Sequence, residues 1–166
     1  MPVVVSKQGA IAVALMASLI GQPAAAQGDG QLVLEPKSCQ RSRMMNKLKQ
    51  QPNQGPCARV VIEQVDGNYI TISFLARGSE RGSSNSLSLG GTTATPLNCR
   101  LNKCRLSQPL KLELDNAKEV AYDSEGNENS LPSAWPAVGS CQLSPEAVSC
   151  SARSMFQANW SAQATF

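Results

Sequence analysis

Two cysteines with four residues between them lie in the segment NCRLNKCRL, residues 98–106, beside Arg100, Lys103 and Arg105. Such a pair could bind a metal, act as a redox centre or form a structural disulfide. A redox motif normally has the spacing C-x-x-C, and a zinc site without histidine needs four converging cysteines. The chain has six cysteines and no histidine, and no second pair has a similar spacing. These residue types favour a disulfide, with no metal site and no cofactor.

The N-terminus has the organisation of a secretory signal. Lys7 is the only charge before the apolar run at residues 10–20, and small residues precede the expected cut after Ala26. An apolar run of eleven residues is too short to span a membrane, which takes about 20. We therefore expect a cleaved signal at residues 1–26 and a single β-rich domain at residues 27–166. That domain would be periplasmic or extracellular, without a transmembrane segment.

Export predicts that the cysteines form disulfides, because thiols pair in the oxidising environment outside the cytoplasm. Two of the pairs fall opposite each other in predicted hairpins, since bends over residues 100–103 and 144–147 also match the neighbouring leucine and valine pairs. The third pair follows by elimination. The predicted disulfides are Cys39–Cys57, Cys99–Cys104 and Cys141–Cys150.

A period of two in the apolar residues predicts β-strands in two places. Residues 58–76 read as two strands around a tight turn at Gly67-Asn68. That turn would set Val65 opposite Ile70. The tail, residues 156–166, alternates without one exception and is the clearest strand in the chain. We expect Phe156, Trp160 and Phe166 to face one way there, and Gln157, Asn159 and Gln163 the other.

Three further segments complete the predicted fold. Residues 109–123 predict a half-buried strand, a turn near Asn116 and a second strand. Residues 77–96 are rich in Gly, Ser and Thr and predict a loop with one short strand at most, at residues 87–89. Residues 124–139 predict a polar loop punctuated by proline. Together the patterns indicate an all-β fold, a small antiparallel sandwich or open barrel of about seven to nine short, disulfide-stapled strands.

One helical turn is expected near the start of the mature domain, over residues 40–50. Met44, Met45 and Leu48 share a face at helical spacing, and Pro52 would end the helix. The three apolar side chains would dock the helix onto the sheet. Its charged side chains would then face the solvent.

Positive charge is concentrated in the same region. The net charge of the chain is +3, and no acidic residue lies between Glu35 and Glu63. The basic run lacks interleaved aromatic residues, which argues against nucleic-acid binding by base stacking. It could instead meet phosphates, lipid headgroups or an acidic polysaccharide, or simply be a solvated face. The anion-binding candidates are Lys37, Arg41, Arg43, Lys47 and Lys49.

Two other patterns have simpler explanations. Oxygen-bearing side chains alternate at Asp123, Glu125, Asn127 and Asn129, as calcium ligands do, but the EF-hand glycine and glutamate positions do not match. We expect a solvated acidic loop there. The alternating tail ends in Phe166 and so resembles the closing strand of bacterial outer-membrane barrels. The few aromatic residues, the cysteines and the short strands favour a half-buried terminal strand instead.

Enzymatic chemistry has little support. The absence of histidine excludes Ser-His and Cys-His dyads, and there is no G-x-S-x-G motif. Glu113 and Asp115 share the solvent face of a strand. We therefore expect a non-catalytic binding or envelope-associated module whose partner is a protein or an anionic envelope component. Two alternatives stay open: a secreted inhibitor or effector that presents the stapled tip at Leu101, and a histidine-free hydrolase with two carboxylates across a cleft.

Overall fold

The computed structural model describes residues 28–45, 53–129, 132–155 and 158–166, which form one sheet of twelve strands. The expected signal, residues 1–26, lies outside this part. The strands are β1 (Gly30–Leu34), β2 (Ser38–Met45), β3 (Asn53–Pro56), β4 (Arg59–Val65), β5 (Tyr69–Arg77), β6 (Ser84–Thr93), β7 (Asn98–Arg100), β8 (Asn102–Arg105), β9 (Leu110–Tyr122), β10 (Ser133–Leu143), β11 (Ala147–Ser154) and β12 (Ala158–Thr165). Their spatial order is β3-β2-β12-β11-β10-β9-β6-β5-β4-β1-β8-β7. Within the described ranges no helix is long and apolar enough to cross a membrane.

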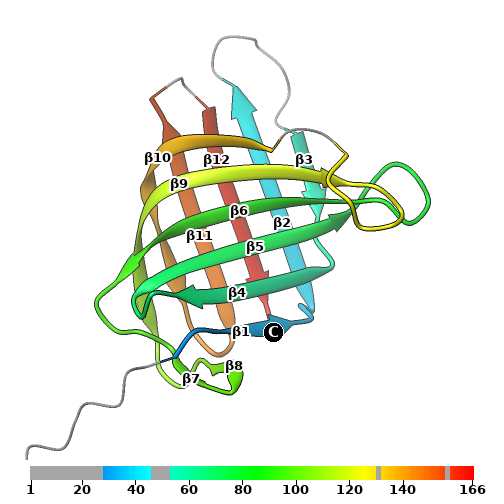
Figure 1. Ribbon diagram of the computed structural model, residues 1–166. Helices are drawn as coiled ribbons and strands as arrows, with labels where there is room; N and C mark the ends of the chain where they lie inside the picture. The colour runs from blue at the N-terminus through cyan, green and yellow to red at the C-terminus, as the bar shows by residue number, and fades with distance from the viewer. Residues whose placement is uncertain (1–27, 46–52, 130–131, 156–157) are drawn as a thin grey trace, which may run out of the picture.

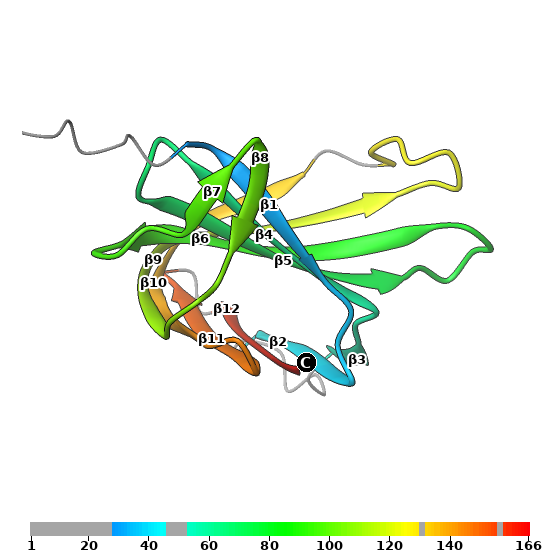
Figure 2. The same ribbon diagram turned by 90° about the horizontal axis from the view of Figure 1, so that it is seen from below.

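The sheet curls back on itself, so that two groups of strands face each other. In Figure 1, β4, β5, β6 and β9 run across β11, β12 and β2, and Figure 2 shows the two layers from below. The strand pairing has two register shifts in the curled part of the sheet. One is at Gly90/Gly91 between β6 and β9, and the other is at Pro136/Gly139 between β9 and β10. Glycine is required there, because a Cβ on Gly91 would lie 2.1 Å from the carbonyl oxygen of Glu113. Bulges of this kind bend a strand and increase its twist.

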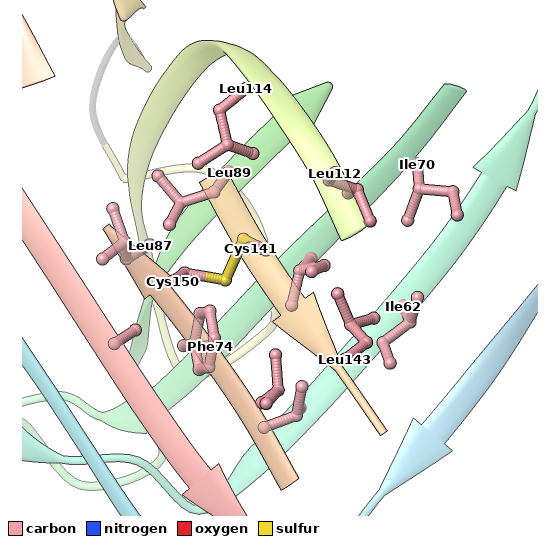
Figure 3. Close-up of a cluster of buried hydrophobic side chains, with 14 of the residues drawn as sticks. Ile62, Ile70, Phe74, Leu87, Leu89, Leu112, Leu114, Cys141, Leu143 and Cys150 are labelled. Atoms are coloured by element: carbon pink, nitrogen blue, oxygen red, sulfur yellow. A yellow bond between two sulfur atoms is a disulfide. The ribbon is translucent and has the colours of Figure 1, made fainter. Parts of the chain in front are cut away.

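The inner face of the curl is the hydrophobic core. Alternate residues of each strand point inward, and Phe74, Ile62 and Leu112 are fully buried. The Cys141–Cys150 disulfide lies among the leucines in the same cluster (Figure 3). On β12, Ala158, Trp160, Ala162 and Ala164 are buried while Gln163 is exposed, and Phe166 is partly buried against the core, as the alternation predicts. Phe156 and Gln157 lie outside the described residues.

All three predicted disulfides are present. Their Cα atoms are 5.1 Å apart in Cys39–Cys57, 3.9 Å in Cys99–Cys104 and 4.1 Å in Cys141–Cys150. The two predicted hairpin registers are also confirmed, because Cys99 is directly opposite Cys104 and Cys141 directly opposite Cys150. Three disulfides are consistent with an oxidising, exported location.

The helical turn predicted over residues 40–50 is wrong. Residues 38–45 form strand β2, which pairs with β12 along its whole length. Met44 and Met45 are 44% and 37% exposed and do not dock a helix onto the sheet. Helical spacing of a few apolar residues is a weak preference, and a short helix without tertiary packing is marginal, so pairing with β12 prevails. Residues 46–52 lie outside the described part.

The hairpin of β4 and β5 is confirmed, but its predicted register is wrong. Val65 lies opposite Tyr69, so the loop has three residues, with Asp66 and Gly67 at φ 52° and 78°. This register sets Ile62 opposite Ile72 on the buried face. The predicted one would have paired Ile62 with Ser73, and burial of the large side chains decides between them.

Strand content was underestimated, with twelve strands instead of seven to nine. The expected loop at residues 77–96 contains β6, a ten-residue strand, and β9 runs through the expected turn at Asn116 without a break. Residues 133–139 of the expected loop at residues 124–139 belong to β10. Neighbouring strands on both sides supply the hydrogen bonds of β6, so its Ser and Gly residues are tolerated despite low strand propensity.

Candidate binding cleft

A cleft of about 730 Å³ opens between the β2–β3 edge and the ends of β5, β6 and β9. Small-molecule sites typically have volumes of roughly 300–1,000 Å³. The lining residues are Arg41, Ser42, Arg43, Gly55, Pro56, Cys57, Ala58, Ala76, Arg77, Asn85, Ser86, Leu87, Glu119, Val120, Ala121 and Ser133. In Figure 1 these segments meet where β6 and β9 extend past β2 and β3.

The two walls of the cleft differ in chemistry. On β2, Arg41 and Arg43 share a face with the buried Cys39, because they lie opposite the inward-facing Ala162 and Trp160 of β12. The other wall consists of β5, β6 and β9, whose inward side chains are mostly small and apolar. These are Ala76, Leu87 and Ala121, with Asn85 and Glu119 as the polar exceptions. The cleft therefore has a cationic wall that faces apolar side chains interspersed with Asn85 and Glu119.

Arg43 is held by side chains of two other strands, although its Nε–H is buried without a hydrogen-bond partner among the described residues. Its Nη1 donates to Oε2 of Glu119 at 2.8 Å, and Nε1 of Trp160 donates to Oε1 of the same carboxylate at 3.2 Å. The guanidinium carbon lies 5.3 Å from the ring centroid of Trp135, within cation–π range. The rings of Trp135 and Trp160 lie 5.4 Å apart. Arg43 is thus part of the structure of the cationic wall, and its charge is already compensated.

Arg41 is half-buried, but its charge is poorly compensated. Its Nη1 lies 3.4 Å from the carbonyl oxygen of Phe74 and 3.5 Å from that of Asn85, longer than the usual 2.9–3.0 Å. Burial lowers the pKa of Arg41 from its ordinary value, and the nearby Glu119 carboxylate offsets this only partly. A desolvated guanidinium without a close counter-charge favours an anion beside it.

The cleft as a whole carries a net positive charge. Three arginines and one glutamate line it, so its formal charge is +2. Arg77 stands exposed at its lip. The side-chain oxygen of Asn85 is buried and has no hydrogen-bond partner among the described residues. An anion beside Arg41 would add a counter-charge to this net-positive cleft.

The predicted anion-binding residues are only partly brought together. Arg41 and Arg43 meet in the cleft, on a strand rather than on a solvated helix. Lys37 lies outside it and donates from Nζ to the carbonyl oxygen of Phe166 at 2.7 Å. Lys47 and Lys49 lie outside the described residues. Sequence reasoning missed Asn85 and Glu119, since neither stands in a motif. Only the alternation that turns every second side chain of β6 and β9 inward could have indicated them.

The acidic loop at residues 123–129 is closed by its own hydrogen bonds. The carboxylate of Asp123 accepts bonds from the backbone N–H groups of Asn127 and Glu125, and the bond from Asn127 contributes most to lowering its pKa. Within the described ranges, no three His, Cys, Asp or Glu residues are grouped so that they could hold a metal ion. At the surface, Glu113 pairs with Lys111 at 2.6 Å, and Asp115 accepts a bond from the Tyr69 hydroxyl at 2.9 Å.

No protein-family model, curated protein or solved structure matches this chain. Function has to be argued from the chemistry of the cleft itself. The cleft offers guanidinium donors on one side and small apolar side chains on the other. Glu119 is the one acid among its described lining residues, and both of its oxygens accept hydrogen bonds. The arrangement suits retention of an anion.

Proposed function

We propose that the protein is an exported, non-catalytic binding module that holds an anion against Arg41 in the cleft between β2 and the ends of β5, β6 and β9. One observation carries the proposal: Arg41 is half-buried, and its only hydrogen bonds to described residues are two long ones, both to backbone carbonyls. A guanidinium in such a place is stabilised by a charge-assisted bond to an oxyanion, which is shorter and about twice as strong as a neutral hydrogen bond.

Export and absence of catalysis are parts of the same proposal. The signal-like N-terminus and the three disulfides favour an oxidising compartment outside the cytoplasm. A hydrolase built on two carboxylates would need a second acid facing Glu119. Glu119 is instead tied to Arg43 and Trp160, and the other described residues that line the cleft are basic, neutral or apolar. Binding without turnover fits this set best.

The proposal is tested by titrating the disulfide-bonded protein with small anions at low ionic strength and following binding by calorimetry. Sodium acetate, benzoate, octanoate and inorganic phosphate are suitable probes. We expect saturable binding of at least one anion, weakened by salt because the Debye length is only about 10 Å at 0.1 M. Arg41→Gln should abolish that binding. Arg153→Gln, on the exposed face of β11, is the matched control and should bind as the wild type does.

Two results would overturn the proposal. One is that no anion binds to the wild type at low salt. The other is that Arg41→Gln and Arg153→Gln bind equally well, which would place the bound anion outside the cleft.

A second candidate function, that of an inhibitor or effector of another protein, is favoured by Leu101. This side chain is 97% exposed at the tip of the β7–β8 hairpin, which the Cys99–Cys104 disulfide closes. Its φ of 50° is a left-handed conformation, which costs a residue with a Cβ about 1–2 kcal/mol. A rigid, exposed apolar tip is suited to insertion into a pocket of a partner.

This second candidate is tested by assays with a panel of extracellular proteases. The wild type should inhibit at least one of them, and Leu101→Asn should not. Equal inhibition by the wild type and Leu101→Asn would refute a role for this tip.

A further inference from the structure

We infer that the ligand of the cleft is an organic monocarboxylate with an apolar body, its carboxylate on Arg41 and its body against Ala76, Leu87 and Ala121. This inference rests on the proposed function and adds the chemical class of the ligand. Three features of the cleft support it: the arginine pair on β2, the amount of uncompensated charge, and the size of the side chains on the opposite wall.

The arginine pair on β2 is suited to binding a carboxylate. Arg41 and Arg43 are two residues apart on β2 and point to the same side, so their guanidinium groups present similar donors to the cleft. Arg43 already binds a carboxylate, that of Glu119, at 2.8 Å. No ion pair of Arg41 with an acid exists in the described part of the chain. A ligand carboxylate beside Arg41 would repeat the contact that Glu119 makes with Arg43, since a planar guanidinium matches the two oxygens of a carboxylate.

The charge of the cleft favours a single negative charge on the ligand. Arg43 is neutralised by Glu119, and Arg77 is exposed at the lip, where water screens it. Arg41 is therefore the one desolvated cation among the described lining residues that has no direct ion pair, since Glu119 acts on it only from a distance. A polyanion such as a diphosphate would bring more charge into this half-buried place than one guanidinium compensates.

The opposite wall favours an apolar body. Ala76 and Leu87 are buried to 7% and 3% exposure, and Ala121 is half-buried beside them. Alanine at two of these three positions leaves space that larger side chains would fill. A ligand that places hydrocarbon against this wall gains roughly 25 cal/mol for each Å² of apolar surface removed from water. An anion without a body, such as acetate, would leave most of the 730 Å³ unused.

The inference is tested by calorimetry with octanoate, acetate and inorganic phosphate on the disulfide-bonded protein. We expect octanoate to bind at least tenfold more tightly than either acetate or phosphate. Arg41→Gln should weaken octanoate binding at least tenfold. Arg41→Lys keeps the charge but loses the planar guanidinium. Its affinity for octanoate should therefore lie between those of Arg41→Gln and the wild type. Ala121→Leu, which fills the apolar wall, should weaken octanoate and leave acetate unchanged, with folding of each variant checked by circular dichroism.

Each other outcome counts against the inference. If acetate or phosphate binds as tightly as octanoate, the ligand class is wrong while the anion-binding function stands. If none of the three binds, both fail together. If octanoate binds but neither Arg41→Gln nor Ala121→Leu changes its affinity, the cleft is not the site. Should Ala121→Leu fail to fold, the comparison of the three probes on the wild type still decides the ligand class.

Discussion

Trp160 and Arg43 lie directly opposite each other on β12 and β2, and both donate a hydrogen bond to the carboxylate of Glu119 on β9. Glu119 thereby joins the two layers of the curled sheet beside the cleft. Trp160 is buried to 2% exposure and belongs to the core, whereas Arg43 faces the cleft. The cationic wall is thus fixed in place by contacts that extend into the core.

Glu119→Ala should destabilise the fold by about 2 kcal/mol, because it leaves the Arg43 guanidinium and the Trp160 indole N–H without their acceptor. The two charged side chains are 33% and 26% exposed, so solvent screening keeps the loss below that of a fully buried pair. Urea denaturation followed by circular dichroism measures it. Lys111→Ala breaks the pair with Glu113, whose side chains are 61% and 69% exposed, and should cost less than about 0.5 kcal/mol. Equal losses in the two variants would show that Glu119 does not join the layers.

Trp160→Ala should cost about 3–5 kcal/mol, since it removes a large buried aromatic side chain from the core. The burial can be checked separately by fluorescence. In a Trp135→Phe protein the remaining Trp160 should emit at short wavelength and resist quenching by acrylamide. Quenching as fast as that of free indole would mean that β12 is peripheral and that its inward face is wrongly assigned.

Leu101→Asn should stabilise the protein by about 1 kcal/mol. Asn tolerates the left-handed conformation that Leu101 adopts at φ 50°, and the 97% exposed leucine side chain has little packing to lose. Thermal unfolding with the disulfides intact measures the change. Met155→Asn is the control, because Met155 is also exposed, at 87%, but is not among the described residues with positive φ. A lower melting temperature for Leu101→Asn would exclude strain at the tip.

Tyr69 should ionise near pH 12 rather than near 10. Partial burial raises the pKa of Tyr69 to about 12, helped by the hydrogen bond that its hydroxyl donates to Asp115. Because the pKa is raised in the folded state, the stabilisation is complete below pH 10 and is lost as the pH rises towards 12. Phenolate absorbance of the wild type minus that of Tyr69→Phe should show this titration. A midpoint near 10 would mean that Tyr69 is neither partly buried nor bonded to Asp115.

The all-β class, two of the three disulfides and the inward face of the tail could be predicted from local patterns in the sequence. The bends at residues 100–103 and 144–147 join strands that are neighbours in the chain, so a local register sets each cysteine opposite its partner. The alternation in β12 is equally local, since a strand with one buried face must alternate whatever it pairs with. Such features follow from a few adjacent residues and need no knowledge of distant contacts.

The conformation of the basic segment depends on a partner strand that is distant in the sequence. Residues 38–45 become a strand because β12 offers them a partner more than a hundred residues away, where the Ser38 and Thr165 hydroxyls lie 2.7 Å apart. That pairing turns Arg41 and Arg43 inward and brings Arg43 to Glu119 on β9. No local pattern encodes which distant strand will be adjacent, because the gain in hydrogen bonds and burial appears only once the sheet has closed. The cleft and the half-buried charge of Arg41 therefore exist only in the folded protein.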